Sequence, residues 1–453
     1  MREERTSPVA TIRGFVAARE RLARRGDFAE TPLAPPFAER IEEVFGVAMS
    51  ARDVVERIVL DVQRDGDAAV SRYTKAFDSR DLEQFEVPKT DWDAAWDGLD
   101  DELRDALLVA AGRITAFHEK QMRQSWIEPE PLGIFGQIIR PLERIGVYVP
   151  GGSAALPSSL MMVVIPARVA GVREIVVSAP PRHQGGVEPV VLAAAKVAGV
   201  DRVFAIGGAQ AIAAMAFGTE TVPHVDKILG PGNIFVTLAK QRVFGAVDID
   251  QLAGPTETML LADDSADVEL IAADMLAQSE HDAQASAILI TTSARVAEEV
   301  QDEIEHQLPT LERHEIARAS LRRNGLVALV NGLTEAVALA NAYAPEHLCL
   351  LVSDPWGLVP SIENAGGIFI GEGSPEALGD YAAGPSHVMP TGGTARFSSP
   401  VNVTDFQKVI SIIGANPRAV TELGPATIRL AEAEGLGGHA ASIRRRLERY
   451  GAE

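Results

Sequence analysis

The feature that most constrains the fold is an alternation of short apolar runs and helical segments, which begins near residue 145. The apolar runs are G-V-Y-V-P (146–150), E-I-V-V-S-A-P (174–180), R-V-F-A-I (202–206), K-I-L-G (227–230) and a run around V-D-I-D (247–250). Strands that alternate with helices of this length predict β-α-β units and a parallel sheet. Their near-continuous apolar character is typical of strands that are covered on both faces.

The alternation resumes after residue 256 and predicts a second α/β unit. Its expected strands are 257–263, 285–291, 347–352 and 367–371. Residues 51–78 and 95–125 each predict a helix from their apolar spacing. A chain of 453 residues exceeds one hydrophobic core, so we expect more than one domain. The predicted class is α/β, with two Rossmann-like parallel-sheet domains, an N-terminal helical arm and a small C-terminal tail domain.

The predicted division assigns each part of the chain to one of four units. These are an arm (1–50), a domain with the metal and acid/base residues (51–147 plus 257–385), a dinucleotide-binding domain (148–256) and a tail (386–453).

Charge and cysteine content exclude several classes of partner. The formal net charge of −21 disfavours nucleic acid and anionic lipid surfaces. The sole cysteine, Cys349, cannot form an intramolecular disulfide or a C-x-x-C site, so we expect a reduced, cytoplasmic protein. The polar start of the chain predicts no secretion signal. Its most apolar run (159–172) contains Pro and Arg, so no membrane span is expected.

Glycines cluster where strands of the first unit end. The turns are P-G-G-S-A (150–154), I-G-G-A-Q-A (206–211) and L-G-P-G-N (229–233). Glycine allows close approach of the backbone, and helix N-termini attract phosphate. Each turn alone fits an ordinary β-α connection, and no G-x-G-x-x-G is present. Together they favour a dinucleotide, with Tyr148, Gln210 and Asn233 placed to contact it.

A second set of polar residues has the chemistry of metal ligands. Gln278 and His281, in A-Q-S-E-H-D, are three positions apart at a helix end and share a face. An imidazole and an amide oxygen can both bind zinc. Asp380 and His439 are isolated candidates for further ligands. The alternative is that these residues are simply solvated.

The segment A-P-E-H-L-C (344–349) places a Glu-His pair at the start of an expected strand. His347 can accept a hydroxyl proton when an alcohol is oxidised, and Glu346 can orient it or deprotonate a water. A solvated pair is the alternative. Cys349 lies one pleat deeper, where a buried thiol is more often a small apolar residue than a nucleophile.

The chain resembles the histidinol dehydrogenase family over nearly its whole length. The matching segments are R-I-G-V-Y-V-P-G-G-S-A, G-G-A-Q-A-I-A-A-M-A-F-G-T, G-P-G-N-I-F-V-T-L-A-K, A-G-P-T-E-T, Q-S-E-H, A-P-E-H-L, S-P-E-A-L-G-D-Y-A-A-G-P-S-H-V-M-P-T and E-G-L-G-G-H. Eight such segments in the family's order make the resemblance specific.

The resemblance implies a zinc-dependent homodimer that oxidises L-histidinol to L-histidine through the aldehyde, with two NAD⁺. It implies one zinc per subunit, held by four ligands, namely Gln278, His281, Asp380 and His439. It makes Glu346 and His347 the acid/base pair. It makes Tyr148, Gln210 and Asn233 contacts of NAD⁺. Thr256, Glu434, His347 and the metal ligands would face the substrate. In the family the tail segment with Glu434 and His439 reaches the other subunit's active site.

Two positions depart from the family's common pattern. Thr256 stands where many members have Ser, and Ser386 stands where many have Asn. The second departure leaves open a related dehydrogenase that acts on another small hydroxyl compound, such as a sulfonated propanediol. A zinc hydrolase would not need the glycine turns. A non-catalytic nucleotide-binding protein would leave the four candidate ligands without a purpose.

Overall fold

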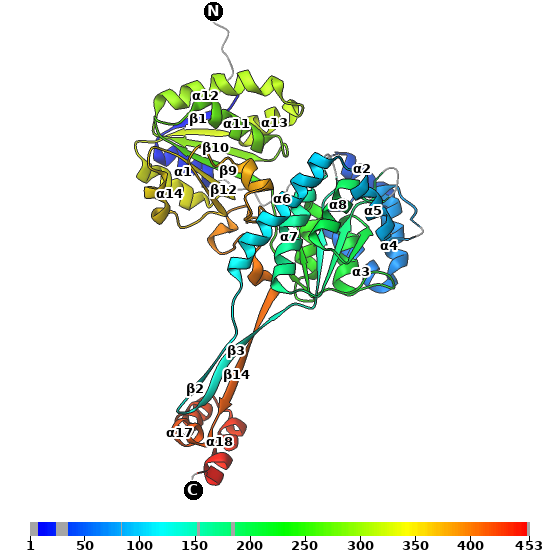
Figure 1. The fold of residues 1–453 in the computed structure, drawn as a ribbon, viewed down its shortest axis with the longest axis vertical. Coiled ribbons are helices and arrows are strands. Elements are labelled where there is room, and N and C mark those ends of the chain that lie inside the picture. The colour runs from blue at the N-terminus through cyan, green and yellow to red at the C-terminus, as the bar shows by residue number, and fades with distance from the viewer. Residues whose placement is uncertain (1–7, 24–34, 83, 152–154, 183–185, 451–453) are drawn as a thin grey trace, which may run out of the picture.

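The computed structural model describes residues 8–23, 35–82, 84–151, 155–182 and 186–450. Two lobes, each built around a sheet, lie side by side, and a narrow stalk projects away from both (Figure 1). No helix in these ranges is long and apolar enough to cross a lipid bilayer.

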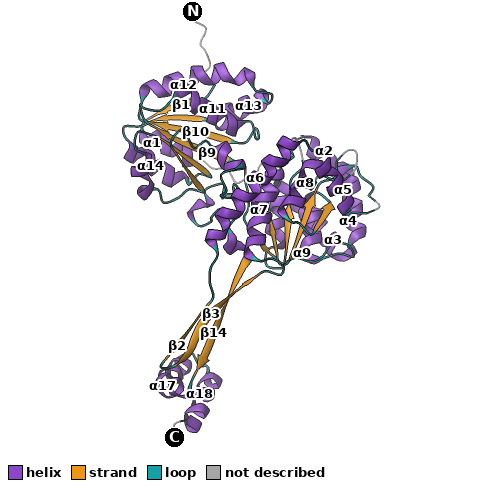
Figure 2. Ribbon diagram, viewed as in Figure 1, coloured by secondary structure: helices purple, strands orange, loops and turns teal. Residues whose placement is uncertain are grey.

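The first lobe contains a five-stranded parallel sheet in the order β6-β5-β4-β7-β8. Its strands are β4 (Arg144–Tyr148), β5 (Glu174–Ala179), β6 (Arg202–Ala205), β7 (Lys227–Leu229) and β8 (Asp248–Ile249). All five were predicted from their apolar runs. Helices cover both faces (Figure 2). Because of this cover, every residue of β5 except Glu174 is fully buried.

Each face of this sheet has its own hydrophobic core. One core takes residues from α5 (Lys89–Asp97), α6 (Asp101–His118), α7 (Pro157–Ala170) and α8 (Pro189–Ala198). The other takes residues from α2 (Pro35–Phe45), α3 (Ala51–Asp65), α4 (Asp67–Asp78), α9 (Gly208–Phe217) and α10 (Ile234–Val243).

The helix predicted over 51–78 is two helices, because Gly66 interrupts it. Gly66 has a φ of 56° and forms both the end of α3 and the start of α4. This left-handed φ favours glycine, and a Cβ atom would also displace the Glu220 carboxylate, whose oxygen would lie 2.4 Å away. The apolar spacing continues across the break and does not reveal it.

The second lobe contains a six-stranded parallel sheet in the order β1-β11-β10-β9-β12-β13. Its strands are β1 (Ala10–Arg13), β9 (Glu257–Ala262), β10 (Ser286–Thr291), β11 (Leu326–Leu329), β12 (His347–Leu351) and β13 (Gly367–Ile370). Four of these strands were predicted, whereas β1 and β11 were not. The flanking helices are α1 (Phe15–Ala23), α11 (Val268–Ser279), α12 (Ala294–Gln307), α13 (His314–Asn324), α14 (Leu333–Tyr343), α15 (Pro355–Leu358) and α16 (Glu376–Tyr381).

Packing corrects part of the predicted division. Helices α3 to α6 were grouped with 257–385, but they pack on the five-stranded sheet of the first lobe. Trp92 and Ile114, for example, are buried against that sheet's core. Residues 8–23 were assigned to a separate arm, but β1 is an edge strand of the second lobe and α1 packs beside it.

The stalk is a three-stranded antiparallel sheet in the order β14-β3-β2, which ends in two helices. Its elements are β2 (Trp126–Glu130), β3 (Gly133–Pro141), β14 (Gln407–Ala415), α17 (Pro417–Ala433) and α18 (Gly437–Tyr450). The predicted tail therefore recruits β2 and β3 from a part of the chain that was assigned elsewhere.

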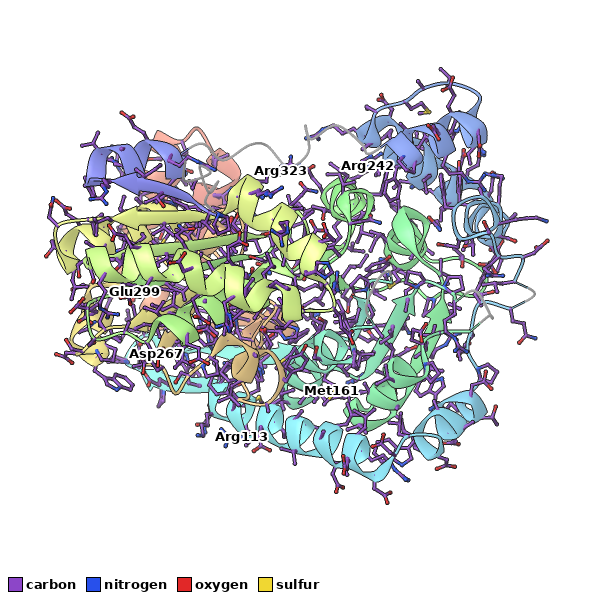
Figure 3. All side chains as sticks on the ribbon, turned by 90° about the horizontal axis from the view of Figure 1, so that it is seen from above. Arg113, Met161, Arg242, Asp267, Glu299 and Arg323 are labelled. Carbon is purple, nitrogen blue, oxygen red and sulfur yellow. The ribbon has the colours of Figure 1, made fainter. Side chains whose placement is uncertain are left out.

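The segment 383–391 joins the two lobes. Arg113 of α6, labelled in Figure 3, donates from Nη2 to the carbonyl oxygen of Ala383 (3.1 Å). The side-chain amide of Gln251 donates to the carbonyl of Met389 (2.7 Å), and the Gly254 amide donates to Oγ1 of Thr391 (2.7 Å). These bonds hold residues that follow β13 against the lobe that contains α6.

Candidate functional site

A cavity of about 930 Å³ opens at the carboxyl ends of the first lobe's strands. The three residues predicted to contact a dinucleotide, Tyr148, Gln210 and Asn233, all line it. It also reaches Pro180, which follows β5. Ligands of open parallel sheets bind at this edge. The size is within the range of cavities that enclose small molecules and cofactors.

Helix N-termini face this cavity. α9 begins at Gly208, whose amide donates to the Tyr148 hydroxyl (3.0 Å). Asn233 caps α10, since its Oδ1 accepts from the amides of Phe235 (3.0 Å) and Val236 (3.2 Å). The cap leaves the Asn233 amide group as a donor to a ligand. Aligned helix N-termini attract anions such as a pyrophosphate. Residues 152–154 of the predicted first turn lie outside the described residues.

A buried ion pair supports the Gly230 turn. Gly230 has a φ of 111°, and a Cβ atom would lie 2.2 Å from the Tyr148 carbonyl oxygen, so only glycine fits. Its amide donates to Oδ2 of Asp250 (2.7 Å), and its carbonyl accepts from Nζ of Lys240 (3.0 Å). Lys240 and Asp250 pair with each other and are 2% and 3% exposed in their side chains. No local sequence pattern predicts this pair, because its members are ten residues apart.

The predicted acid/base pair lies in the second lobe, at the amino end of its sheet. Ala344 has a φ of 53° and ends α14, so that the chain turns at Pro345 into β12. This turn buries Glu346 and His347, which are 6% and 4% exposed. The alternative of a solvated pair is therefore excluded for the described structure.

A chain of hydrogen bonds runs through Glu346. Nε2 of Gln278 donates to Oγ1 of Thr256 (2.6 Å), and this hydroxyl donates to Oε2 of Glu346 (2.6 Å). The same carboxylate oxygen accepts from the amide of Glu257 (3.0 Å). Position 256 needs a hydroxyl group to join Gln278 to Glu346, and either serine or threonine supplies one. The bond also orients Gln278, since its amide oxygen is the atom left to bind a metal.

His347 has one ring nitrogen held and one free. Nδ1 donates to the carbonyl oxygen of Glu257 (3.1 Å), which fixes the tautomer because a carbonyl can only accept. Nε2 is buried and has no hydrogen-bond partner among the described residues. It lies 3.7 Å from Oδ1 of Asp380, which is beyond hydrogen-bond distance. Nε2 is thus the ring atom positioned to exchange a proton with a bound ligand.

Carboxyl groups dominate the electrostatics around His347. Burial lowers its pKa, but Glu376, Glu346 and Asp380 outweigh burial and raise the pKa to about 10. Burial raises the pKa of Glu346 to about 7 and also raises the pKa of Glu376. The buried negative groups outnumber the positive ones. Such a site is suited to a further cation.

Cys349 is not placed to act as a nucleophile. It is 1% exposed, and its thiol donates to Oε1 of Glu376 (3.0 Å). Burial and the charge of Glu376 raise its pKa well above the usual value, so the thiol stays protonated. Glu376 also accepts from the hydroxyl of Thr258. Glu376 was missed from the sequence, although it precedes Asp380 by one helical turn on α16.

Three of the four predicted metal ligands lie in this site. Gln278 lies in the last turn of α11, and the amide of His281 donates to the carbonyl oxygen of Gln278 (3.4 Å). Burial opposes the ionisation of Asp380, but the charges of His347, His387 and His281 outweigh it and lower the pKa of Asp380. The amide oxygen, imidazole and carboxylate fit zinc.

The fourth predicted ligand is not brought to the others within one chain. His439 lies on α18, and Glu434 ends α17, so both are at the far end of the stalk (Figure 1). Consistent with this separation, no three His, Cys, Asp or Glu side chains of the described ranges gather as a metal site. Within one chain the four predicted metal ligands therefore do not come together.

Ser386, which stands where many members of the family have Asn, is held by local contacts. Ser386 is 3% exposed, and its hydroxyl donates to the carbonyl of Met162 on α7 (3.1 Å). The neighbouring His387 donates from Nδ1 to the carbonyl of Asp380 (2.7 Å) and accepts from the hydroxyl of Ser159 (3.0 Å). Ser386 therefore anchors the segment after α16, and His387 orients the backbone at Asp380.

Comparison with known proteins agrees with this site. The sequence model described as histidinol dehydrogenase matches residues 46–447. The histidinol dehydrogenase of Deinococcus radiodurans is 49% identical over 433 residues, which cover 95% of this chain and 99% of that protein. The enzyme of Thermus thermophilus is 53% identical over 394 residues, covering 87% and 94%.

A solved structure extends the likeness to the whole fold. The crystal structure of histidinol dehydrogenase from Elizabethkingia anophelis aligns with a TM-score of 0.90 at 34% identity, covering 98% of this chain and 99% of that one. With the family match and the two relatives, this places the chain in the histidinol dehydrogenase family.

Proposed function

We propose that Glu346 and His347 carry the proton transfers of an NAD-dependent, zinc-dependent oxidation of L-histidinol to L-histidine. Family membership makes the protein an NAD-dependent oxidoreductase of histidine biosynthesis. The observation that supports the residue roles is the buried chain from Gln278 through Thr256 to Glu346, beside the free Nε2 of His347.

In the first step, Nε2 of His347 takes the hydroxyl proton while the carbinol carbon loses a hydride and becomes the aldehyde carbon. The raised pKa leaves His347 protonated at neutral pH in the described structure, so a bound cation that offsets the surrounding carboxylates would have to lower this pKa before Nε2 can accept a proton. The first-lobe cavity would hold NAD⁺, which would supply the hydride acceptor for each of the two oxidations.

In the second step, Glu346 deprotonates the water that adds to the aldehyde carbon. The hydrated aldehyde then loses the second hydride, and its remaining hydroxyl proton passes to solvent as the carboxylate forms. Burial raises the pKa of Glu346 to about 7, which suits a base that must also release its proton near neutral pH. Protonated Cys349 has no part in this route.

Gln278, His281 and Asp380 would hold the zinc ion. A zinc ion supplies a Lewis acid that fixes the imidazole and amine of the substrate. Thr256 lies next to Gln278 and would line the substrate side of the same site.

We propose that the active enzyme is a homodimer in which the stalk of one subunit completes the other subunit's site. The support is the separation of His439 and Glu434 from the remaining ligands. The stalk also carries exposed apolar side chains, including Ile127, Ile413 and Leu430, which are 56%, 77% and 68% exposed. Exposed apolar surface of this kind favours association. A cytoplasmic location stays a prediction that rests on the unpaired Cys349.

The stoichiometry of the reaction tests the function. Purified protein supplied with zinc should form two NADH for each L-histidinol consumed, and a chelator should abolish this activity until zinc is restored. The absence of histidinol turnover by zinc-loaded protein would contradict the proposal. Turnover of a sulfonated propanediol in preference to histidinol would favour the related dehydrogenase instead.

Mixed dimers test the shared site. His347→Ala and His439→Ala proteins should each be inactive, because each lacks a group at both sites. Mixing them under conditions that exchange subunits should restore about a quarter of the wild-type activity, since half of the dimers then contain one intact site. If no activity returns although subunits exchange, the two residues act within one chain.

A further inference from the structure

The dinucleotide cavity contains a carboxylate that none of the roles above uses. Asp78 is the last residue of α4, and it lines the cavity together with Tyr148 and Gly208. Its Oδ2 atom is buried and has no hydrogen-bond partner in the described ranges. No ion pair of Asp78 occurs there either. Arg40 lines the same cavity, but it donates to the Ala76 carbonyl (2.9 Å) and to Glu43 (2.6 Å).

Keeping Asp78 in this position costs stability in the free protein. Burial raises its pKa to about 6, so it is mostly ionised at neutral pH without a counter-charge. Its charge in turn contributes to the raised pKa of Tyr148, after the larger effect of burial. The carboxylate also stands at the C-terminal end of a helix, where the helix dipole disfavours a negative charge.

No structural role offsets this cost. Asp78 does not cap a helix, because α4 begins at Asp67, and the chain leaves α4 through Ser79 in the left-handed region (φ 56°). A buried polar atom without a partner is a functional candidate when it faces a ligand cavity. The missing partner is a hydrogen-bond donor, because an ionised carboxylate can only accept.

The end of the cavity near Asp78 fits the adenosine half of a dinucleotide. Its apolar lining there includes Ile41, Phe77 and Val54, from α2, α4 and α3. In Figure 1 these helices lie on the side of the first lobe away from β12, the strand that begins at His347. The nicotinamide must approach the reacting carbon, so the adenosine end points the other way.

We propose that Asp78 accepts hydrogen bonds from the 2′- and 3′-hydroxyls of the adenosine ribose and thereby selects NAD⁺ over its 2′-phosphorylated form. The inference rests on the proposed function, in which this cavity binds NAD⁺. A rotation of the Asp78 carboxyl group that brings the buried Oδ2 to the cavity would match its two oxygens to the two vicinal hydroxyls of a ribose. A 2′-phosphate in the same place would meet a like charge. In many dinucleotide folds an acidic residue after a strand has this role, whereas here the carboxylate comes from a helix end outside the sheet.

Titration of Asp78→Asn tests the contact directly. Its dissociation constants for NAD⁺ and ADP-ribose should rise on the order of tenfold to a hundredfold, since bonds to a charged acceptor are lost. The constant for nicotinamide mononucleotide should not change. The preference for NAD⁺ over NADP⁺ in kcat/KM should fall at least about tenfold. Asp81→Asn is the matched control, because Asp81 is an exposed carboxylate three residues further on.

Stability separates a ligand contact from a structural role. Without nucleotide, Asp78→Asn should melt at the same temperature as the wild type or higher, because an uncompensated buried charge is removed. A lower melting temperature would make Asp78 a structural residue and overturn the inference.

Other outcomes separate the inference from the function on which it rests. If the wild type neither binds NAD⁺ nor forms NADH from histidinol, the proposed function fails. If it does both while Asp78→Asn binds NAD⁺ and ADP-ribose normally, only the inference fails. Weaker binding of nicotinamide mononucleotide with unchanged ADP-ribose would overturn the adenosine assignment.

Discussion

The two parallel sheets present opposite edges to their sites. The first-lobe sheet faces its cavity with its carboxyl edge, where Tyr148 ends β4 and Gly208 opens α9. The second-lobe sheet has its candidate catalytic groups at its amino edge, where Glu257 begins β9 and His347 begins β12. In a β-α-β unit the carboxyl edge is lined by helix N-termini and the amino edge by helix C-termini.

This difference in helix polarity matches the charges that each site has to bind. Helix N-termini favour anions, so the first-lobe edge is suited to the phosphates of a dinucleotide. Helix C-termini favour cations, and α11 and α14 end beside Gln278 and Glu346. The lesson is that a β-α-β lobe can hold an anionic cofactor or a cationic centre, depending on which edge carries the functional side chains.

At the amino edge, we expect the largest loss of activity when the proposed general base, His347, is replaced. His347→Ala should lower kcat by about a thousandfold or more for both oxidations. The first oxidation loses its general base, and the second loses the contacts that the His347 imidazole makes in the site. Initial rates of NADH formation with histidinol and with histidinaldehyde measure this. Cys349→Ser should retain most activity; a Cys349→Ser enzyme that forms aldehyde and stops would show that the thiol takes part.

At the carboxyl edge, we expect the largest effect of a substitution on the free energy of unfolding of the protein. Lys240→Met leaves Asp250 buried without its counter-charge and should lower the free energy of unfolding by about 3–5 kcal/mol. Urea denaturation measures the loss. The double variant Lys240→Met/Asp250→Asn should recover part of it, since no charge then stays unpaired. KM for NAD⁺ should rise with KM for histidinol unchanged; a change in the histidinol KM alone would break the comparison between the two edges.

Glu346→Gln should separate the two oxidations at the amino edge. Histidinaldehyde oxidation should fall about a hundredfold, because no base remains to activate water, while histidinol oxidation falls less. The number of NADH formed per histidinol should approach one. Equal losses in both steps would mean that Glu346 acts only by positioning His347.

Thr256 gives the smallest expected effect at the amino edge. Thr256→Ser keeps the hydroxyl that joins Gln278 to Glu346, so kcat should stay within about twofold of the wild type. Thr256→Val removes it, leaves buried polar groups without partners and should lower kcat about tenfold. Equal activity of the two variants would show that the hydroxyl chain has no catalytic role.

Much of the candidate site was predictable because its signals are local. Glu346 and His347 are adjacent, the turn at Pro345 marks the start of a strand, and Gln278 and His281 share one helix end. Glu376 could have been added by the same reasoning, since it lies one turn before Asp380. Asp78 could not have been predicted in this way, because no residue near it in the sequence indicates that it lines a cavity with Tyr148 and Gly208.

By itself the sequence determined the α/β class and most strands of both sheets, and it pointed to Glu346 and His347 as the proposed acid/base pair. Apolar spacing reports how a segment is buried, and segments with near-continuous apolar character are recognisable without their neighbours. Glycine turns and capping residues such as Asn233 are equally local.

Only the tertiary structure decided which segments pair and which charges lack a partner. β1 pairs with β11 across more than three hundred residues, and the short sequence A-T-I-R carries no sign of that partner. The helices of 51–118 pack on the first-lobe sheet, although their apolar faces would suit either lobe. The distance of His439 from the other ligands also depends on where the stalk points. Pairing and burial of charge are set by contacts between distant parts of the chain, which no local pattern contains.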